Sequence, residues 1–534
     1  MPDTVSDYIK PQLTDDLPPF EATPDMIREH ARQRPDQMAA MCEGRRVTWA
    51  AFDRRLNKVA RALSASGIGP GDKVAALSSN SIEYLELFMG VLRAGACMVP
   101  LSTMGAADAL EGMMDNSDSK LFFVSAQYID LVAPVAHRLS KLLPGGLIAF
   151  DFERAGWQGY EAWLAPHSDA DVRVAIEPED DFNIIYSSGT TGLPKGILHS
   201  HRMRSVMRDR MTALGFAPDG ISLVSTPLYS NTTLAGMLPM IQCGGAVILM
   251  RRFDVRQFLE IAQAEKVTHA MLVPVQYQRI LADPAFGSYD LSSFRMKLST
   301  SAPLRAHIKA DCLARWPGRL VEIYGLTEGG GVCTLDATAF PDKLHTVGQP
   351  GLGSELKIID EQGNELPQGE VGEIVGRATL MMKGYYKQPD KTQDLFWYDK
   401  DGRLFFKSGD MGRIDEDGFV ILLDRKKDMI ISGGFNVYAA DIEVLLLKHP
   451  DVIDVAVIGI PSEQWGESPL ALCVRRPGVT AIEQQIQEWA NVQLSKTQRL
   501  VGVEFRESLP RNTIGKIMKR ELREPYWAGR AAKI

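Results

Sequence analysis

Residues 186–198, YSSGTTGLPKGIL, form a segment whose residue types suit the binding of phosphate. Seven of its thirteen residues are Ser, Thr or Gly. In such a loop successive N–H groups point into one concavity, glycines allow close approach, hydroxyls add donors and Lys195 adds charge. It is not a Walker loop, because Lys195 follows Pro194 and precedes Gly196. A flexible surface loop of the same composition is the alternative.

Residues 322–331, EIYGLTEGGG, group three more side chains that suit a nucleotide. The tyrosine offers a ring for stacking, the threonine a hydroxyl donor and the glutamate a carboxylate for a hard cation. In residues 406–443, Asp410 follows a glycine at a predicted strand end, where it could accept two sugar hydroxyls, and Arg425 and a Gly-Gly turn follow. Taken alone, the first segment is typical of a turn with an exposed glutamate and the second of a β-meander with charged turns.

Near the C-terminus, LPRNTIGKIMKREL places Lys516 after a glycine turn and before a predicted basic helix. On composition alone this lysine would be solvated. From Asp424 to the end there are 16 basic and 14 acidic residues, and from Lys496 onward there are 10 basic and 4 acidic residues. This local excess of positive charge suits a polyanionic ligand.

The elements that position these groups follow an alternating pattern. Residues 73–81 predict a strand, residues 82–96 a helix and residues 97–102 the next strand, and the alternation returns after residue 119, with a helix over residues 128–139, and after residue 221. Such alternation implies βαβ units and parallel sheets. Residues 355–378 instead have short alternating runs between Gly-rich turns, which predict antiparallel hairpins.

The phosphate-type segment is expected to be a loop between a strand at residues 181–188 and a helix at residues 196–210. After residue 424 the chain resumes β and α patterns that could form a small separate domain. The organisation is therefore one large body with a C-terminal lobe.

Length and composition limit the functions to consider. At 534 residues the chain exceeds the size of one hydrophobic core, so two or more domains are expected. Its 45% hydrophobic and 24% charged residues are typical of a soluble globular protein, and its net charge of −8 argues against a general nucleic-acid binder. No apolar run approaches the length of a membrane span, and the first residues do not have the pattern of a signal peptide.

The cysteines stand singly, without a CxxC pair or a His/Cys cluster at metal-ligand spacing. They are expected to be buried thiols in a reducing compartment, and the expected location is cytoplasmic. The six are Cys42, Cys97, Cys243, Cys312, Cys333 and Cys473.

Five motifs occur in a diagnostic order: YSSGTTGLPKG, YGLTE, KSGD, DRKKDMIISGGFNVY and PRNTIGK. In order and approximate separation they resemble the adenylate-forming superfamily of acyl-CoA synthetases, firefly luciferases and peptide-synthetase adenylation domains. The resemblance spans about residue 25 to about residue 522. It implies an α/β fold with a large N-terminal domain of layered βαβ subdomains plus a small β-barrel-like subdomain, residues 1–423, and a small mobile α+β C-terminal domain, residues 424–534, with a hinge near residues 424–428.

The resemblance also implies the chemistry of the first step, in which a carboxylate attacks the α-phosphorus of ATP and pyrophosphate leaves. Glu328 would bind Mg²⁺, Thr327 would contact the α-phosphate, and Lys516 would bridge the carboxylate and the α-phosphate. Preorganised charge of this kind commonly contributes several kcal/mol per group. The β and γ phosphates would be held by Ser187, Ser188, Gly189, Thr190, Thr191, Gly192 and Lys195. The rest of the nucleotide would be held by Tyr324 on adenine, Asp410 and Arg425 at the ribose, and by Ser301, Ala302, Pro303, Glu322 and Ile323.

For the second step, the loop Ser432, Gly433 and Gly434 resembles the part of acyl-CoA ligases that lines a pantetheine tunnel, where a Cβ would narrow the passage. Trp465 resembles a residue near the CoA nucleotide, although a half-buried packing residue is an equal alternative. The basic Lys496 and Arg499 could meet the CoA phosphates.

The acyl pocket is where the chain departs from its relatives. These ligases often have a histidine or aromatic residue after TPLY, but TPLYSNTTL has Ser230, which suggests a wider passage or a different acceptor. Small residues at LSTSAP and at the triple glycine would leave room for a bulky or long acid. The expected pocket residues are Tyr229, Ser230, Asn231, Ser299, Thr300, Gly325, Gly330 and Gly331.

The expected function is therefore an ATP- and Mg²⁺-dependent carboxylate:CoA ligase that converts a medium- or long-chain, or a bulky aryl or alicyclic, acid to its acyl-CoA. Its partners would be the acid and coenzyme A, with no nucleic acid and no membrane span, and an oligomer is compatible with the sequence. An amide-forming ligase with an amino acid or amine acceptor, a luciferase-like oxygenase and a non-enzymatic nucleotide sensor are the alternatives. The Gly-Gly loop disfavours the oxygenase.

Overall fold

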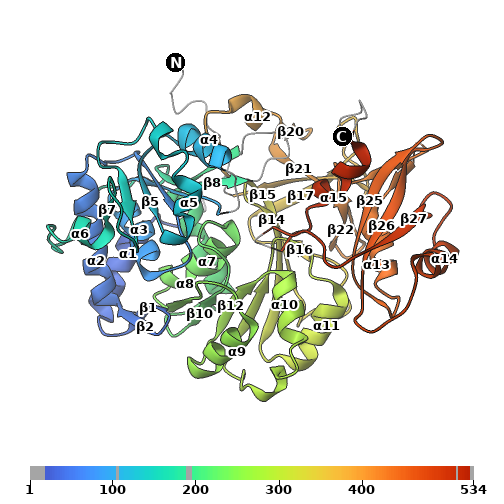
Figure 1. Cartoon of the computed structure of the whole chain (residues 1–534), viewed down its shortest axis with the longest axis horizontal. Coiled ribbons are helices and arrows are strands. Elements are labelled where there is room, and N and C mark those ends of the chain that lie inside the picture. The colour runs from blue at the N-terminus through green and yellow to red at the C-terminus, as the bar shows by residue number, and fades with distance from the viewer. Residues whose placement is uncertain are drawn as a thin grey trace.

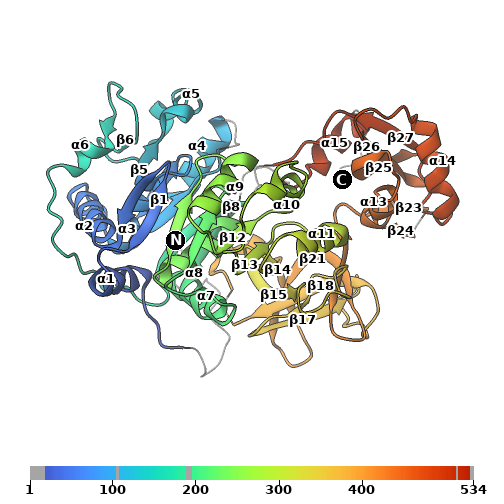
Figure 2. The ribbon, with the colours of Figure 1, turned by 90° about the horizontal axis from the view of Figure 1, so that it is seen from below.

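The structure is a computed structural model that describes residues 18–103, 107–187, 195–379, 381–433, 435–512 and 515–528. Its strands form four sheets, and the elements after residue 429 make a lobe of their own at one end of the molecule (Figures 1 and 2). The expected α/β class, with a large N-terminal body of sheets and a small C-terminal domain, is confirmed.

The first large sheet has mainly parallel strands, as the alternating pattern predicts. In spatial order its strands are β19 (Gly384–Tyr385), β9 (Lys195–Ser200), β8 (Asp181–Ser187), β4 (Cys97–Pro100), β3 (Lys73–Leu77), β5 (Ser119–Val124), β6 (Leu147–Ala149) and β7 (Gln158–Gly159). The two edge pairings, β8 with β9 and β9 with β19, are antiparallel.

The prediction of a helix over residues 196–210 is wrong for its first five residues. Residues 195–200 form β9, because Ile197 and Leu198 are buried and pair with β8. The helix α7 (His201–Ala213) begins only after Ser200, whose hydroxyl caps it by accepting from the Met203 amide. The phosphate-type segment therefore joins two strands and not a strand and a helix.

The second large sheet contains the remaining βαβ units. In spatial order its strands are β16 (Gln349–Pro350), β15 (Gly329–Asp336), β14 (Arg319–Leu326), β13 (Met296–Ser299), β12 (His269–Leu272), β10 (Ile221–Val224), β11 (Ala246–Leu249), β1 (Met38–Cys42) and β2 (Arg45–Thr48). From β13 to β1 the neighbours are parallel, so their carboxyl ends meet along one edge.

Helices between and outside the two large sheets complete the layers. One apolar core joins both sheets to the helices between them, α1 (Thr23–Gln33), α2 (Trp49–Ala65), α3 (Ile82–Arg93), α7 and α8 (Asn231–Gln242), with the short α6 (Tyr160–Leu164) at its side. A second core packs α9 (Val255–Ala264), α10 (Pro274–Leu281) and α11 (Ala306–Arg315) on the second sheet, and a third packs α4 (Ala107–Ser117) and α5 (Ile129–Val132) on the first.

The helix expected over residues 128–139 is mostly absent. Only α5 is α-helical there, with single 3₁₀ turns at Ala126–Tyr128 and Ala136–Arg138, and a third 3₁₀ turn lies at Phe286–Ser288. Pro134 explains the break, because it removes a helical N–H donor and clashes with the preceding turn.

Helices α2 and α3 pack unusually closely at Gly90. A Cβ placed on this residue would lie 2.3 Å from Cγ1 and 2.5 Å from Cβ of Val59. Glycine at this position therefore sets the distance between two helices of the central layer.

The third sheet confirms the antiparallel hairpins predicted for residues 355–378. It contains β17 (Ser354–Ile359), β18 (Gly372–Ala378), β21 (Leu404–Ile414), β20 (Phe396–Tyr398) and β22 (Val420–Arg425), with α12 (Pro389–Gln393) beside it. The fourth sheet forms the C-terminal lobe from β24 (Phe435–Val437), β23 (Ile430–Ser432), β26 (Gly466–Arg475), β25 (Val452–Ser462) and β27 (Gly502–Arg506), together with α13 (Ala439–Leu446), α14 (Glu483–Gln493) and α15 (Lys519–Trp527).

Two features of the composition have structural counterparts. Five of the six cysteines are buried thiols, as expected, and Cys243 is only half-buried. Within the described ranges, no helix is long and apolar enough to cross a bilayer.

Candidate active site

The phosphate-type segment lies at the end of a β-hairpin. Ser187 closes β8 and pairs with Lys195, which opens β9. The predicted phosphate ligands Ser188, Gly189, Thr190, Thr191 and Gly192 lie outside the described residues. Lys195 holds its ammonium 4.7 Å from the centre of the Tyr385 ring, a cation–π distance. Tyr385 comes from the neighbouring strand β19.

Glu328 and Thr327 form the tight turn between β14 and β15, beside this hairpin. Tyr385 donates a hydrogen bond of 2.8 Å to Oε1 of Glu328, and the backbone carbonyl of Glu328 accepts from the Met382 amide at 2.9 Å. The Thr327 carbonyl accepts from Nε2 of His199 at 2.8 Å. The turn is therefore tied to the first sheet through β9 and β19, next to Lys195.

Tyr324, Asp410 and Arg425 are in direct contact. The Tyr324 hydroxyl donates to Oδ2 of Asp410 at 2.9 Å, and Nε of Arg425 lies 2.6 Å from Oδ1. Burial, together with the Asp410 charge, raises the pKa of Tyr324 well above its ordinary value. Asp410 lies inside the long strand β21, opposite Arg425 on β22, and not at a strand end as the sequence suggested. Both carboxylate oxygens of Asp410 therefore contact protein groups, one Tyr324 and the other Arg425.

Lys516 reaches this group from the C-terminal lobe. The backbone amide of Lys516 donates a hydrogen bond of 2.9 Å to Oδ1 of Asn512, which holds the loop. The loop turns at Gly515, whose φ is +75°. A Cβ on Gly515 would lie 2.4 Å from Cγ1 of Val275, so the loop backbone packs directly on the start of α10. Burial, and then the charge of Arg425, lower the pKa of Lys516 to about 8, while Asp410 opposes them.

The predicted pocket residues gather at the carboxyl edge of the second sheet, where ligands of open α/β sheets bind. Ser230 is buried and caps α8 by accepting from the Thr232 amide, and the Thr232 hydroxyl hydrogen-bonds Ser301. Ser301 has φ +79°, an uncommon conformation for a residue with a side chain. The buried Ser299 hydroxyl at the end of β13 has no hydrogen-bond partner among the described residues.

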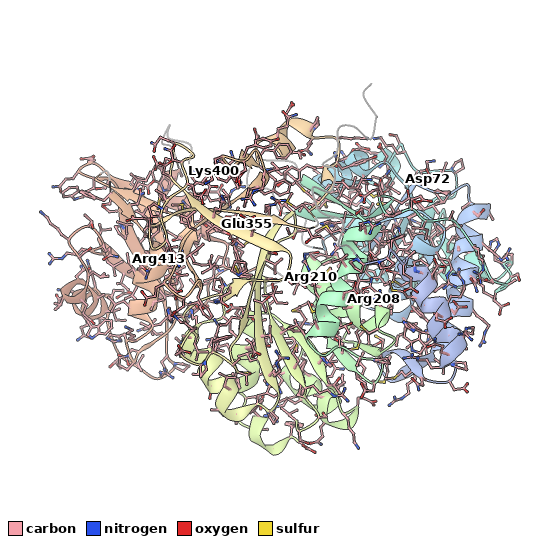
Figure 3. The ribbon with its side chains drawn as sticks, turned by 180° about the vertical axis from the view of Figure 1, so that it is seen from behind. Asp72, Arg208, Arg210, Glu355, Lys400 and Arg413 are labelled. Carbon is pink, nitrogen blue, oxygen red and sulfur yellow. The ribbon has the colours of Figure 1, made fainter. Side chains whose placement is uncertain are left out.

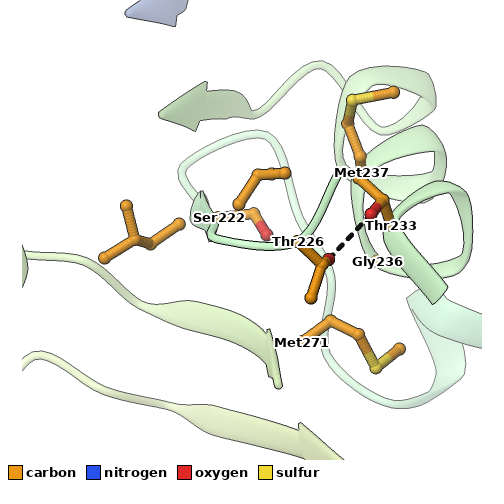
Figure 4. A pocket seen from close by; sticks show the side chains of 8 residues that line it. Ser222, Thr226, Thr233, Gly236, Met237 and Met271 are labelled. Carbon is orange, nitrogen blue, oxygen red and sulfur yellow. Dashed lines mark hydrogen bonds between the residues drawn. The ribbon is translucent and has the colours of Figure 1, made fainter. Parts of the chain in front are cut away.

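A small pocket, with no room for a water molecule, lies beneath this edge, between α8 and the strands β10 and β12 (Figure 4). The hydroxyls of Thr226 and Thr233 share a 2.7 Å hydrogen bond across it. A Cβ on Gly236 would lie 2.6 Å from Cβ of Met271, so this glycine allows α8 to approach β12. The pocket is lined by Ser222, Leu223, Val224, Thr226, Thr233, Gly236, Met237 and Met271.

The remaining predicted positions on this side differ in exposure. Ile323, Thr300 and Ala302 are half-buried, Gly325 and Pro303 are exposed, and Tyr229 is buried.

Glu322, Gly330 and Gly331 serve the fold in ways the sequence did not indicate. The Glu322 carboxylate is buried, forms an ion pair with Lys309 and accepts from the Leu304 amide, so its side chain is already engaged. A Cβ on Gly330 would lie 2.9 Å from Cβ of Phe406. One on Gly331 would lie 3.0 Å from Leu356. The space next to these two glycines is therefore filled by the third sheet, which corrects the expectation that it is left for the acid.

In the C-terminal lobe, the predicted thiol-side residues lie together. Gly433 has φ +59°, donates its amide to the Trp465 carbonyl at 2.7 Å, and a Cβ on it would lie 2.7 Å from the Trp465 ring. Ser432 is buried beside them, Trp465 is 43% exposed, and Gly434 lies outside the described residues. Lys496 and Arg499 are exposed.

Four residues at the site were missed in the sequence. Tyr385 lies in the segment KGYYKQ, which carries no motif that would have indicated its role. Asn183, His199 and Arg204 form one buried hydrogen-bonded group behind Thr327. A signal existed, because Asn183 and His199 interrupt the apolar runs DFNII and GILHS.

Two sequence profiles match the chain. One described as AMP-binding enzyme covers residues 27–386, more than half of the chain, and one described as AMP-binding enzyme C-terminal domain covers residues 441–516. The chain belongs to the AMP-binding enzyme family. It is an AMP-forming acid–thiol ligase, and the resemblance to the adenylate-forming superfamily is confirmed.

Individual relatives match over nearly the whole chain. A fatty acid–[acyl-carrier-protein] ligase, ScoC of Streptomyces coeruleorubidus, is 33% identical over 95% of this chain and 96% of its own length. A feruloyl-CoA synthase of Amycolatopsis sp. is 34% identical over 93% of this chain and 97% of its own length.

Solved structures agree with the fold. ATP-bound MatB from Rhodopseudomonas palustris is 30% identical, with a TM-score of 0.84 over 95% of this chain and 99% of that one. The amide bond synthetase McbA from Marinactinospora thermotolerans is 27% identical, with a TM-score of 0.83 over 94% of this chain and 99% of that one.

Proposed function

We propose that this enzyme is an ATP-dependent carboxylate:CoA ligase. In the first step, an oxygen of the acid attacks the α-phosphorus of ATP, the bond to the pyrophosphate breaks, and an acyl adenylate forms. In the second step, the thiol of coenzyme A attacks the acyl carbon and AMP leaves. The first step requires an anion to approach a polyanion, so positive groups at the meeting point are its main requirement.

The position of Lys516 is the observation on which the proposal rests. This lysine comes from the C-terminal lobe, and its loop backbone packs on Val275 of the N-terminal body. Its ammonium is close enough to Asp410 and Arg425 for both charges to act on its pKa. These contacts support the proposal that Lys516 bridges the carboxylate and the α-phosphate beside the proposed ribose site.

The remaining nucleotide roles follow from the contacts around it. Asp410 would accept the ribose hydroxyls, supported by Arg425, and the Tyr324 ring would stack on adenine. Thr327 would contact the α-phosphate, and Lys195 would support the hairpin loop at the outer phosphates.

Glu328 fits the proposed Mg²⁺. Tyr385 occupies Oε1, and within the described residues no hydrogen bond or ion pair engages Oε2. A single carboxylate suits Mg²⁺, because this ion is commonly held by one or two carboxylates, phosphates and water. When bound, the ion supplies charge neutralisation to the phosphates.

For the second step, we infer that the C-terminal domain, residues 424–534, rotates about a hinge near residues 424–428. The hinge would include the last two residues of β22 and the turn that follows, ahead of β23. Rotation would bring Ser432, Gly433 and Trp465 to the acyl adenylate, with Lys496 and Arg499 available to the CoA phosphates.

The proposed acid is a medium- or long-chain, or a bulky aryl or alicyclic, acid. The fatty-acid and feruloyl relatives support both branches of this class, and the chain is similarly distant from each. A carrier-protein thiol is a second candidate acceptor, supported by the ScoC relative, and an amine is a third, supported by the likeness to McbA. The six thiols suit a reducing compartment, and the proposed location is the cytoplasm.

The test is a screen for acid-dependent pyrophosphate release over fatty, aryl and alicyclic acids, each with and without CoA. We expect release with a subset of acids, stimulation and acyl-CoA formation on adding CoA, and loss of release in Lys516→Ala with the fold retained. An unchanged pyrophosphate-exchange rate in Lys516→Ala would refute the assigned role. Turnover with an amine and without CoA would identify the amide ligase, and ATP binding without release would identify a nucleotide sensor.

A further inference from the structure

Arg204, on α7, is a buried cation behind the proposed active site. The residue is 1% exposed, and in the described part of the chain no acidic group contributes to its electrostatics. Burial lowers its pKa to about 9, so the guanidinium stays charged at neutral pH. A buried charge is normally paired with an opposite charge, so one held only by neutral groups requires an explanation.

Besides a long contact of 3.8 Å to Sδ of Met207, the guanidinium donates to three neutral acceptors. Its Nε donates to Oδ1 of Asn183 at 3.0 Å, one terminal nitrogen donates to Oδ1 of Asn231 at 2.9 Å, and the other donates to Nδ1 of His199 at 3.0 Å. Since arginine can only donate, each partner atom must be an acceptor.

These contacts fix the orientation of two residues at the site. His199 accepts at Nδ1, so its proton is on Nε2, and that nitrogen donates to the Thr327 carbonyl at 2.8 Å. Asn231 presents its carbonyl oxygen to Arg204, so its NH₂ group is the part left over. In the described residues no hydrogen bond from this NH₂ is found.

Asn231 is well placed to use those donors. It is the first residue of α8, directly after Ser230, at the carboxyl edge of the second sheet where the predicted acyl pocket lies. The N-terminus of a helix favours negative charge, and a buried cation one hydrogen bond away strengthens that preference.

We propose that Arg204 and Asn231 select acids whose acyl part bears an oxygen acceptor, namely a hydroxyl, a keto or a second carboxyl group. Asn231 would donate to that oxygen, and Arg204 would act as the residue that positions it. The inference rests on the proposed function and narrows its substrate class. A site built to hydrogen-bond a polar group discriminates strongly against an analogue that lacks it, because its own polar groups are then unpaired.

The experiment compares kcat/KM for pyrophosphate release between matched acids. One series is octanoate, its hydroxy and oxo isomers, and octanedioate, and a second is cinnamate with its hydroxylated forms. The readout is kcat/KM for the oxygen-bearing acid divided by kcat/KM for the plain acid. This ratio does not depend on the fraction of enzyme that is folded. We expect a ratio of at least about ten in the unaltered enzyme for the best-placed oxygen. Octanedioate carries a charged second oxygen group, whereas the hydroxy and oxo acids carry a neutral one, so comparing them shows which kind of acceptor is preferred.

Three variants locate the source of the ratio. Asn231→Leu and Arg204→Met should each lower the kcat/KM ratio to about one. Arg204→Lys should restore part of the ratio, because the cation is present again. The matched control is Arg208→Met on the same helix (Arg208 is labelled in Figure 3), since Arg208 pairs with Glu21, and its ratio should not change. If Arg204→Met does not fold, Asn231→Leu decides alone.

The outcomes separate the two levels of inference. Pyrophosphate release with no preference for oxygen-bearing acids, or a preference that survives in Asn231→Leu, would overturn this inference and leave the ligase assignment standing. Absence of release with every acid would overturn the proposed function itself.

Discussion

The Tyr385 hydroxyl donates a 2.8 Å hydrogen bond to Oε1 of Glu328, the carboxylate that we assign to Mg²⁺. The two residues come from different parts of the fold, β19 and the turn between β14 and β15. The bond fixes one oxygen of the carboxylate and leaves the other for a ligand. Groups that orient a metal ligand commonly matter nearly as much as the ligand itself.

Tyr385→Phe should therefore weaken the use of Mg²⁺. We expect the Mg²⁺ concentration for half-maximal pyrophosphate release to rise about tenfold, because Glu328 is no longer held in one orientation. Tyr386→Phe is the matched control, since the Tyr386 hydroxyl bonds Asp118. An equal shift in both variants, or none in Tyr385→Phe, would contradict the assignment.

The activity should depend on the protonation of Lys516. Its pKa is lowered to about 8 by burial and by Arg425, and the proposed role needs the cation. The charged form predominates below this pKa, so kcat/KM for ATP in pyrophosphate exchange should fall as the pH rises through about 8. In Lys516→Arg, whose guanidinium stays charged, this alkaline limb should disappear even though the rate is lower. A limb that persists in Lys516→Arg would assign the titration to another group.

Gly433→Ala should separate the two steps of the reaction. The added methyl would lie 2.7 Å from the Trp465 ring, at a residue with φ +59°. We expect pyrophosphate exchange within about twofold of normal and acyl-CoA formation reduced by an order of magnitude or more, because the methyl must displace Trp465, which belongs to the proposed thiol side of the site. Acyl-CoA measured by chromatography, beside exchange of labelled pyrophosphate, gives both rates.

Its control is Gly478→Ala in the same lobe. Gly478 also has a left-handed φ, +83°, but a Cβ there would meet nothing within 4 Å. Backbone strain is therefore matched while the contact with Trp465 is absent. If both variants lost acyl-CoA formation equally, strain in the lobe and not the passage would be the cause.

Gly90→Ala should destabilise the central layer. The methyl would lie 2.3 Å from Cγ1 of Val59, so α2 and α3 must separate or Val59 must leave its rotamer. We expect the free energy of unfolding to fall by about 1–3 kcal/mol in denaturant titrations. Gly287→Ala, where nothing lies within 4 Å, should change it far less. Equal losses would show that helix spacing is not the cause.

The sequence predicted best where the information is local. The strand and helix at residues 73–96 correspond to β3 and α3, because a buried apolar run and a Ser81 cap define them without help from the rest of the chain. It failed at residues 196–200, whose apolar pattern fits a helix or a strand equally, and only pairing with β8 decides for a strand.

The site shows the same limit. Glu328, Asp410 and Lys516 could be proposed because each lies in a short motif, but the partners that orient them come from distant elements. The ion pair of Glu322 with Lys309 and the contact of Gly330 with Phe406 were not predicted, because folding alone brings both partners near. The group of Asn183, His199 and Arg204 needs three elements at once, so no single segment could reveal it.

The contact between Gly515 and Val275 bears on how readily the C-terminal lobe could separate from the N-terminal body between the two proposed steps. Gly515 contributes no side chain to this contact with Val275 and Val273, so it adds no side-chain apolar area that separation would expose. In the proposed two-step reaction this contact would position the Lys516 ammonium while the domains meet, and it would separate at small cost once pyrophosphate has left. A side chain at position 515 would either clash with Val275 and prevent the lobe from docking, or add apolar contact and slow its release. Glycine at this position therefore favours repeated turnover.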